Sequence, residues 1–267
     1  MNVATVLHIH NNELLVRDTL DSIMKYVGSN VLVIYDGAVS YWGENLNLPV
    51  PKCSGLYHNY NRNPYRNIAL GLSKISQLFP ESDWYCYCEY DVLFGNDLFK
   101  KELEIRSKQN YWCLGNDYRI YNGLKFPFLE KILNKQLYRT DYLLGCCVFY
   151  HNKFIKKLLD IEFFNKLLSF SNGFSKGFFP EFTEYDLSEH IYPTMAHHLG
   201  GKIGTFAKYE NNMWKGRYKQ YPLRFKPDLN ELWEEASIMH PLKEYDSEIR
   251  NFFRNKRNKD GRQNDSE

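Results

Sequence analysis

The sequence lacks several features that would by themselves fix the class of the protein. No stretch approaches the ~20 apolar residues of a membrane-spanning helix. The N-terminus has no basic run, and polar residues from Asn11 onward interrupt its first apolar stretch, so we expect no signal peptide. An excess of charge of one sign is also missing, because 34 lysines and arginines nearly balance 32 aspartates and glutamates. We therefore expect no nucleic-acid partner.

The six cysteines form no CxxC pair, which argues against a zinc site. Most of them lie in apolar, strand-like runs, where Cys86 and Cys88 would share one face and the adjacent Cys146 and Cys147 would face opposite sides. We interpret them as buried thiols, and we expect the protein to be located in a reducing cytoplasm.

The chain can bury a sizeable core, since 43% of its 267 residues are hydrophobic. Aromatic residues are frequent, with 21 tyrosines and 18 phenylalanines. Most of these rings should fill the core, and a few can serve as stacking platforms for sugar or base rings.

The first 36 residues or so have the pattern of a βαβ unit. Val3–His10 alternates and is rich in β-branched residues, Leu14–Tyr26 has helical spacing, and Val31–Tyr35 is a continuous apolar run typical of a buried parallel strand. Further along, the same criteria predict helices at Tyr65–Phe79, Asp97–Arg106, Lys153–Leu168 and Leu187–Leu199, and strands at Trp84–Cys88, Tyr111–Leu114, Leu143–Tyr150 and Lys202–Phe206.

This alternation predicts an α/β fold with a mostly parallel, doubly wound, Rossmann-like sheet flanked by helices, followed by a C-terminal helical or loop extension. We assign residues 1–245 to the domain and residues 246–267 to a basic, polar C-terminal tail. Ligands of such sheets bind outside the carboxyl ends of the strands. Asp36, Glu89 and Asp91 all fall at predicted strand ends, so we expect three carboxylates to converge on one crevice.

The triplet Glu89-Tyr90-Asp91 directly follows a buried run. Two carboxylates at positions i and i+2 past a strand end can direct their oxygens at one cation, and Mg²⁺ and Mn²⁺ prefer such ligands. A bound cation would neutralise a diphosphate and stabilise it as a leaving group. Acidic triplets also occur by chance on solvated turns, and the position after a buried strand favours the metal site.

Several short motifs follow one another in a definite order. Asn12-Glu13 follows the first strand, residues 19–23 (TLDSI) lie in the first helix, and Asp36-Gly37 ends the second strand. Then come residues 65–72 (YRNIALGL), 89–91 (EYD), 144–150 (LGCCVFY), 183–188 (TEYDLS) and 200–203 (GGKI). Over roughly residues 3–206 this ordered set resembles the family 2 glycosyltransferases of the GT-A fold.

The resemblance implies a nucleotide-diphosphate sugar as the donor, with a UDP-sugar as our expectation, and Mn²⁺ or Mg²⁺ as the metal. Asp91 would be the main metal ligand, with Glu89 binding directly or through water. Asp36 would contact the base or ribose, and Arg66 or Asn67 would help to close the nucleotide pocket. Tyr90 would also contact the nucleotide.

Glu184 matches the position of the family's catalytic base, with Asp186 two residues on. In an inverting transfer this carboxylate removes a proton from the acceptor hydroxyl. The acidic pair is spread out here, so the assignment stays open among Glu181, Glu184 and Asp186. The triplet also begins with Glu89 in place of Asp, and no Gln-x-x-Arg-Trp element of processive synthases is present. We expect a carbohydrate or lipid-linked glycan acceptor, such as a growing surface glycan, and no polymer synthesis.

His240-Pro241-Leu242-Lys243 stands out in the C-terminal region. Many GT-A enzymes carry a histidine after the core sheet as a third metal ligand, and a nearby lysine can touch the diphosphate. His240 would then bind metal and Lys243 the donor. A surface histidine before a turn that begins at proline is the alternative.

Residues 250–262 are basic and include Phe252 and Phe253. We expect a solvated, partly disordered end. The alternative is an anchor that holds the enzyme peripherally at the inner face of the membrane, where a lipid-linked acceptor would lie.

Two other functions compete with glycosyl transfer. A sugar nucleotidyltransferase needs a glycine-rich phosphate loop after the first strand, and residues 10–13 (HNNE) contain no glycine. A non-catalytic domain that binds a sugar nucleotide, a carbohydrate or a partner protein would show no metal-dependent nucleotide binding. The sequence leaves the oligomeric state open.

Overall fold

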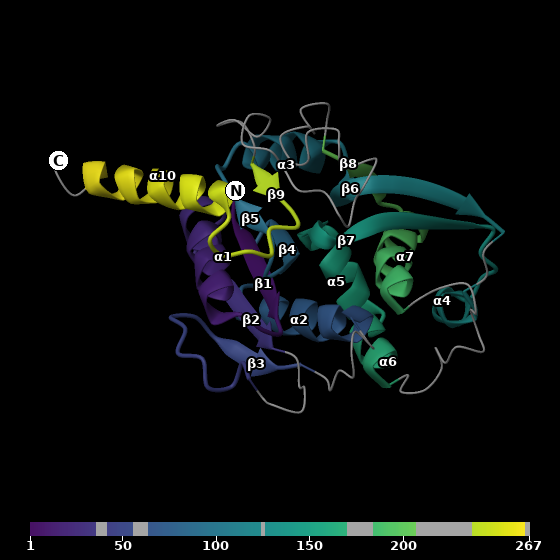
Figure 1. Cartoon of the computed structure of the whole chain (residues 1–267). Helices are drawn as coiled ribbons and strands as arrows, with labels where there is room; N and C mark the ends of the chain where they lie inside the picture. The colour runs from purple at the N-terminus through teal and green to yellow at the C-terminus, as the bar shows by residue number, and fades with distance from the viewer. Residues whose placement is uncertain (36–41, 56–63, 124–125, 170–183, 207–236, 265–267) are drawn as a thin grey trace.

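The computed structural model describes residues 1–35, 42–55, 64–123, 126–169, 184–206 and 237–264. Its centre is a seven-stranded sheet in the order β3-β2-β1-β4-β7-β6-β8 (Figure 1). Six of these strands run in the same direction, and β7 alone is antiparallel to its neighbours β4 and β6. The predicted α/β class with a mostly parallel sheet is confirmed.

The strands of this sheet are β1 (Val3–Ile9), β2 (Val31–Tyr35), β3 (Lys52–Ser54), β4 (Trp84–Glu89), β6 (Tyr111–Asn122), β7 (Arg139–His151) and β8 (Lys202–Thr205). A second, two-stranded antiparallel sheet pairs β5 (Leu93–Phe94) with β9 (Ile238–Met239). The described helices are α1 (Glu13–Tyr26), α2 (Pro64–Leu78), α3 (Phe99–Lys108), α4 (Pro127–Leu133), α5 (Asn152–Asp160), α6 (Phe163–Ser169), α7 (Glu184–His198) and α10 (Glu248–Asn264).

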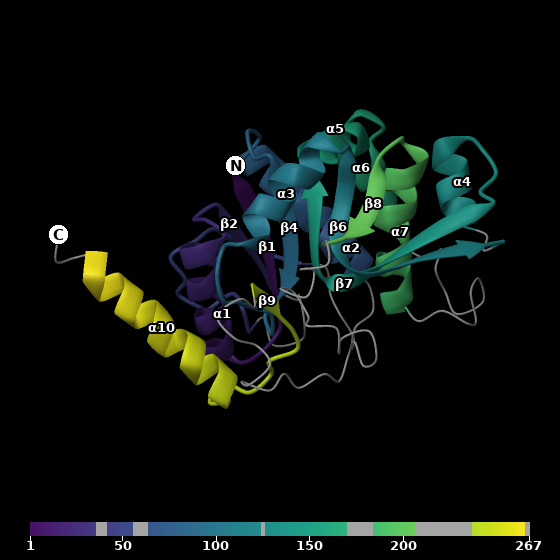
Figure 2. The same ribbon diagram turned by 90° about the horizontal axis from the view of Figure 1, so that it is seen from above.

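Helices cover both faces of the large sheet (Figure 2). Side chains of a strand point alternately to its two faces, so β1 contributes Leu7 to one core and Val6 to the other. The core on the side of Leu7 includes residues of α1 and α3. The core on the side of Val6 includes residues of α2 and of α4 to α7. Burial on both faces explains why β1, β2 and β4 have continuous apolar sequences.

The prediction of one long helix at residues 153–168 is wrong, because this segment forms two helices, α5 and α6. The helical conformation is interrupted between them at Glu162, whose φ of 54° is in the left-handed region. After the break, Phe163, Phe164 and Leu167 of α6 are buried in the second core. The change of direction therefore lets both short helices place an apolar face on the sheet.

The expectation of a disordered C-terminal end is wrong for residues 248–264, which form helix α10. The helix lies across α1 and then runs out from the body of the molecule (Figures 1 and 2). Phe253 is fully buried in a small core with Leu93, Met239, Leu242 and Ile249. Arg250 is also fully buried, and it forms an ion pair with Asp18 of α1. Packing to the domain therefore orders a segment whose composition alone suggested disorder.

Candidate metal and nucleotide site

The carboxyl ends of β1, β2 and β4 lie at the same edge of the sheet, because the three strands are parallel and adjacent. In this register, His8 of β1 is paired with Glu89 of β4 on one side and with Ile34 of β2 on the other. Tyr35, the last residue of β2, is therefore close to the level of Glu89. Asp36, which follows it, lies outside the described residues, so its predicted place in the crevice stays a prediction.

The small sheet brings the C-terminal region to this edge. After β4 the chain turns, with Val92 N donating to Glu89 O, and enters β5. Strand β9 pairs with β5, and just beyond it Leu242 N donates to Asp91 O at 2.9 Å. His240 follows β9 directly, so these backbone bonds place its side chain beside the acidic triplet.

Glu89, Asp91 and His240 form one compact cluster. His240 Nε2 lies 3.3 Å from Asp91 Oδ1 and 3.7 Å from Glu89 Oε2. One ligand atom from each residue falls within 4.8 Å of the other two. Asp91 and His240 are each 3% exposed, whereas Glu89 is half-buried. The three residues suggested as metal ligands thus lie together, and their binding of a metal stays a prediction.

The donor set of the cluster fits a divalent cation. Two carboxylates suit Mg²⁺ and Mn²⁺, and an imidazole shifts the preference towards a transition ion such as Mn²⁺. Among the residues that the structure describes, this is the only such group of three or more potential ligands. The cluster lies where ligands of parallel sheets usually bind, at the carboxyl ends of the strands.

The charges in the cluster depend on each other. Burial alone would raise the pKa of Asp91, but His240, Lys243 and Arg250 outweigh this effect and lower that pKa. Burial alone would lower the pKa of His240, but Cys146 and Asp91 raise it well above its usual value. Burial also raises the pKa of Cys146, whose thiol is then neutral, so Asp91 is the partner that keeps His240 protonated. A cation that enters the cluster must displace this proton.

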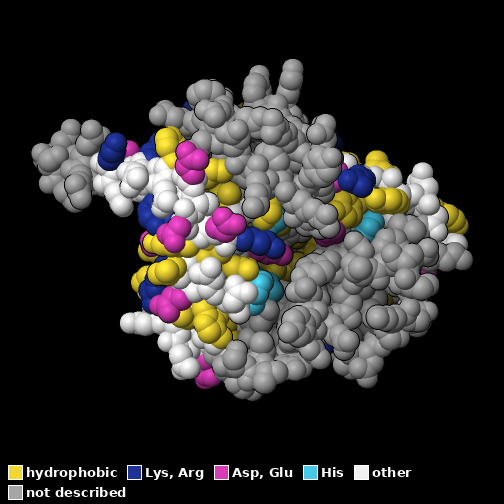
Figure 3. Space-filling view, in the orientation of Figure 1, with side chains coloured by type: hydrophobic (Ala, Val, Ile, Leu, Met, Phe, Trp, Pro, Cys, Tyr) yellow, Lys and Arg dark blue, Asp and Glu magenta, His cyan; other side chains and the backbone are white. Residues whose placement is uncertain are grey.

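Lys243 adds a positive charge at the entrance. Its Nζ lies 4.0 Å from Asp91 Oδ2, and its side chain is 69% exposed. A lysine so placed can turn towards an anionic ligand at little cost, because it is not held by burial. On the face drawn in Figure 3, histidine, acidic and basic side chains gather around a hollow near the middle of the molecule.

Tyr90 lies between the two metal-ligand candidates of the triplet and is only 8% exposed. Its ring makes an edge-to-face contact with His10, with ring centroids 4.4 Å apart. Burial, followed by the charge of Asp91, raises the pKa of Tyr90 to about 12. The phenol is therefore neutral at physiological pH and keeps its proton.

Arg66 and Asn67 both belong to α2. Arg66 Nη2 donates to Leu168 O of α6 at 2.9 Å, and the Asn67 side chain is fully buried close to Gly55. These positions give both residues a part in packing α2 against its neighbours. Their contact with a nucleotide remains a prediction.

Glu184 and Asp186 lie in the first turn of α7, and their side chains are not among those described. Glu181 lies outside the described residues altogether. The assignment of the base therefore stays open among these three residues. The structure adds Glu189, one turn further along α7, whose Oε1 accepts a hydrogen bond from Gly145 N at 3.0 Å. Gly145 directly precedes Cys146, the neighbour of His240.

Three residues near the cluster were not assigned to the site from the sequence, namely His10, Cys146 and Arg250. His10 could have been suspected because it directly follows the first strand, next to the predicted crevice. Cys146 is brought close by the antiparallel pairing of β7 with β4, in which Cys147 is opposite Cys88. Nothing in the local sequence indicates Arg250, because its partner Asp18 is 232 positions away.

No family model and no curated protein matches the sequence. Among solved structures, the chain is similar to a glycosyltransferase involved in the glycosylation of the major capsid of PBCV-1, with 12% identity, a TM-score of 0.49 and coverage of 95% of this chain and 100% of that one. The glycosyltransferase GlyE of Streptococcus pneumoniae has 10% identity and a TM-score of 0.48, with 96% of this chain and 60% of that chain covered. TarS of S. aureus has 12% identity and a TM-score of 0.39, with 78% and 35% covered.

Within the described part of the chain, no helix combines the length and the apolar composition needed to cross a membrane.

Proposed function

We propose that this chain is a metal-dependent glycosyltransferase that moves a sugar from a nucleotide-diphosphate donor, a UDP-sugar, to a hydroxyl group of a glycan acceptor. The observation that carries the proposal is the cluster of Glu89, Asp91 and His240 at the carboxyl ends of parallel strands. This donor set is suited to hold a cation against a diphosphate. The ordered motifs of the sequence support the same activity.

Asp91, His240 and Glu89 would hold Mn²⁺ or Mg²⁺. The cation supplies positive charge that stabilises the departing nucleoside diphosphate. Lys243, which is exposed beside Asp91, would also contact the diphosphate. Tyr90 can donate a hydrogen bond from its neutral phenol. Asp36 binds the base or ribose.

Arg66 and Asn67 complete the nucleotide pocket by fixing α2 beside it. Arg66 is held through its bond to Leu168 O, and Asn67 through its burial. Both residues then act on the nucleotide side of the site through the position of their helix.

The acceptor side is formed by the start of α7. A carboxylate there, Glu184 or Asp186, removes the proton of the acceptor hydroxyl as its oxygen attacks the anomeric carbon. The bond from that carbon to the diphosphate breaks in the same step, which inverts the configuration. Helix N-termini favour ionised carboxylates, and a base must be ionised to accept the proton.

The acceptor is a carbohydrate or a lipid-linked glycan in the cytoplasm, at the inner face of the membrane in the second case. Peripheral contact with lipid would have to use the exposed side of α10, with Phe252 and Lys259. Arg250 and Arg257 are buried and therefore unavailable for lipid headgroups.

A panel of nucleotide sugars tests the proposal, with release of free nucleotide measured with and without Mn²⁺. We expect release with at least one donor, dependent on the cation and lost in Asp91→Asn. Asp160→Asn, an exposed carboxylate at the end of α5, is the matched control and should retain full release. Metal-dependent binding of nucleotide without any release would instead favour a non-catalytic binding domain. Release that is unaffected by chelation would contradict the role of the cluster.

A further inference from the structure

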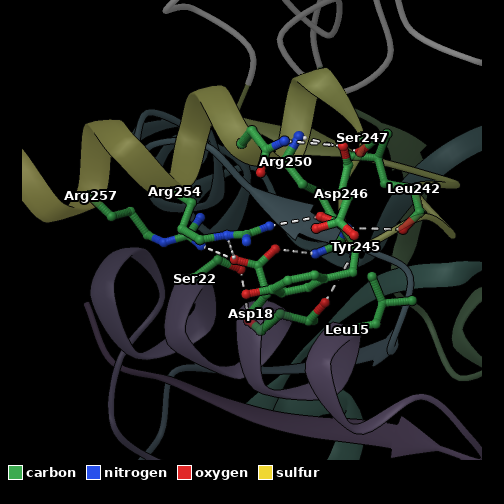
Figure 4. A network of polar contacts seen from close by, with 12 residues as sticks. Leu15, Asp18, Ser22, Leu242, Tyr245, Asp246, Ser247, Arg250, Arg254 and Arg257 are labelled. Atoms are coloured by element: carbon green, nitrogen blue, oxygen red, sulfur yellow. Dashed lines mark hydrogen bonds and ion pairs between the residues drawn. The ribbon is translucent and has the colours of Figure 1, made fainter.

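Arg250 connects the C-terminal helix to Asp18 of α1 and to Leu242, which follows His240 in the chain (Figure 4). Its guanidinium is fully buried and bonded in three directions. Nε donates to Leu242 O at 2.9 Å, Nη1 donates to Asp18 Oδ2 at 2.7 Å, and Nη2 donates to Thr19 Oγ1 at 3.2 Å. Such a planar fork can hold three acceptors in a fixed arrangement, which a lysine cannot do.

The first of these bonds fixes the segment that contains His240. Leu242 is two residues beyond His240, and its carbonyl is held by Arg250 while its N–H donates to Asp91 O. The backbone at Leu242 is thus held from both sides, by α10 and by the acidic triplet. The position of His240 relative to Asp91 depends on these two bonds.

The third bond reaches the triplet through Thr19. The Thr19 hydroxyl accepts from Arg250, and its single hydrogen is shared between the carbonyls of Tyr90 and Val92, which lie 2.6 Å and 2.9 Å from Oγ1. These carbonyls flank Asp91 on either side. One turn further along α1, Ser22 Oγ accepts from Phe94 N, which fixes the start of β5 to the same helix.

We propose that Arg250 is a positioning residue for the metal cluster, which it assembles by bonding the Leu242 segment and, through Thr19, the Tyr90–Val92 turn to one guanidinium. This inference rests on the proposed function for the identity of the site. It gives α10 a role in catalysis although the helix lies outside the central sheet. The ligands Asp91 and His240 come from different parts of the chain, and Arg250 holds the two parts in register.

The network also provides a matched control within the same helix. Arg257 is buried and binds the same carboxylate, through its contact with Asp18 Oδ1. This contact involves neither Leu242 nor Thr19. Arg254 lies 3.4 Å from Asp18 Oδ1 as well. Asp18 therefore keeps cationic partners when either Arg250 or Arg257 is replaced, and both variants should fold.

The sign of the effect separates positioning from simple electrostatics. Arg250 is close enough to lower the pKa of Asp91 through its charge. If that charge were its only influence, removing it would strengthen the binding of a divalent cation. If Arg250 positions the ligands, removing it will weaken binding, by about 10- to 100-fold as for other residues that orient metal ligands.

The test is direct binding of Mn²⁺ to the full chain without nucleotide, followed by the loss of the aqueous Mn²⁺ signal in electron paramagnetic resonance. Arg250→Met should raise the Kd by about 10- to 100-fold, whereas Arg257→Met should leave it within about twofold of the wild-type value. Melting temperatures of both variants show whether they are equally folded. An unchanged or lower Kd in a folded Arg250→Met protein overturns the proposal.

A second pair of variants keeps the test decisive if Arg250→Met does not fold. Thr19→Val removes only the hydroxyl that connects Arg250 to the Tyr90 and Val92 carbonyls, and Thr19→Ser retains it. We expect weaker Mn²⁺ binding in Thr19→Val and near wild-type binding in Thr19→Ser. Equal affinity in the two Thr19 variants also overturns the proposal. If the wild-type protein itself binds no Mn²⁺, the proposed function fails, which is distinguishable from the failure of positioning alone.

Discussion

His240 Nε2 lies 3.3 Å from Asp91 Oδ1, and both side chains are almost completely buried. A buried carboxylate is costly unless a cation compensates it. In the metal-free protein that cation is the protonated imidazole, whose pKa Asp91 raises. The same pair can exchange the proton for a divalent ion, because each residue offers a ligand atom to the shared space.

Asp91→Asn should abolish the dependence of nucleotide binding on Mn²⁺. The amide keeps the size of the side chain but loses the charge that attracts the cation, so the fold should be retained. Titration of Mn²⁺ into the variant in the presence of UDP or GDP, with a thermal-shift readout, checks this. Wild-type activity of Asp91→Asn at limiting Mn²⁺ would exclude Asp91 as a ligand.

The affinity for Mn²⁺ should increase with pH. Because the pKa of His240 is raised, the imidazole is protonated below that pKa, and a metal must displace one proton to bind. The Kd should therefore fall by about tenfold per pH unit until the pKa of His240 is passed. The lowered pKa of Asp91 keeps the carboxylate ionised throughout, so it adds no dependence in this range.

Calorimetry of Mn²⁺ binding in buffers of different ionisation enthalpy measures the released proton directly. His240→Gln should bind Mn²⁺ more weakly and with a flatter pH dependence. A wild-type Kd that does not change between about pH 6 and pH 8 would show that His240 is not a ligand.

Much of the sheet and part of the site could be predicted because the evidence for them is local. The βαβ pattern of residues 3–35 follows from periodicity, and the structure confirms it. The carboxylates at the end of β4 follow from their position, and the structure places them beside His240. The buried bond between Arg250 and Asp18 could not be predicted, because it joins positions 232 residues apart and no periodic pattern marks it. For the same reason a basic segment whose arginines have internal partners was expected to be disordered.

Gly71→Ala should destabilise the protein although alanine is the better helix former. The residue lies in α2, where an added Cβ would come 2.7 Å from Ile34 Cδ1 and 2.7 Å from Val6 Cγ1. Overpacking of this kind costs about 1–3 kcal/mol, more than the gain of about 1 kcal/mol in helix propensity. Denaturant unfolding should show a lower midpoint, with Gln77→Ala, exposed on the same helix, as the neutral control. A higher midpoint for Gly71→Ala would mean that β1 and β2 yield to the methyl group.

Asp36→Ala should weaken donor binding more than it slows turnover. A contact with the base or ribose is equally strong in the ground state and in the transition state, so its loss raises the apparent Kd for the donor and leaves the rate constant nearly unchanged. Kinetics at saturating donor, together with direct nucleotide binding, separate the two effects. A loss of turnover with unchanged donor binding would contradict the assignment.

The last prediction concerns the base, for which Glu184 is our first candidate and Asp186 our second. Both lie in the first turn of α7, where the helix dipole favours the ionised carboxylate that a base requires. If Glu184 is the base, Glu184→Gln should lower turnover by about 10²-fold or more while donor binding stays near wild type. Asp186→Asn should then cost mainly stability, about 1 kcal/mol if its side chain caps the helix.

Turnover and melting temperature of the two variants, measured side by side, distinguish the roles. Glu189→Gln is the matched control on the same helix. Glu189 accepts a hydrogen bond from Gly145 N, so its replacement should lower the melting temperature more than the turnover. If Asp186→Asn abolishes turnover at an unchanged melting temperature and Glu184→Gln does not, Asp186 is the base. If neither variant loses turnover, the base lies elsewhere, and Glu181 is the next residue to replace. If the variants of all three carboxylates stay active, the inverting mechanism is contradicted, whereas the metal cluster is not.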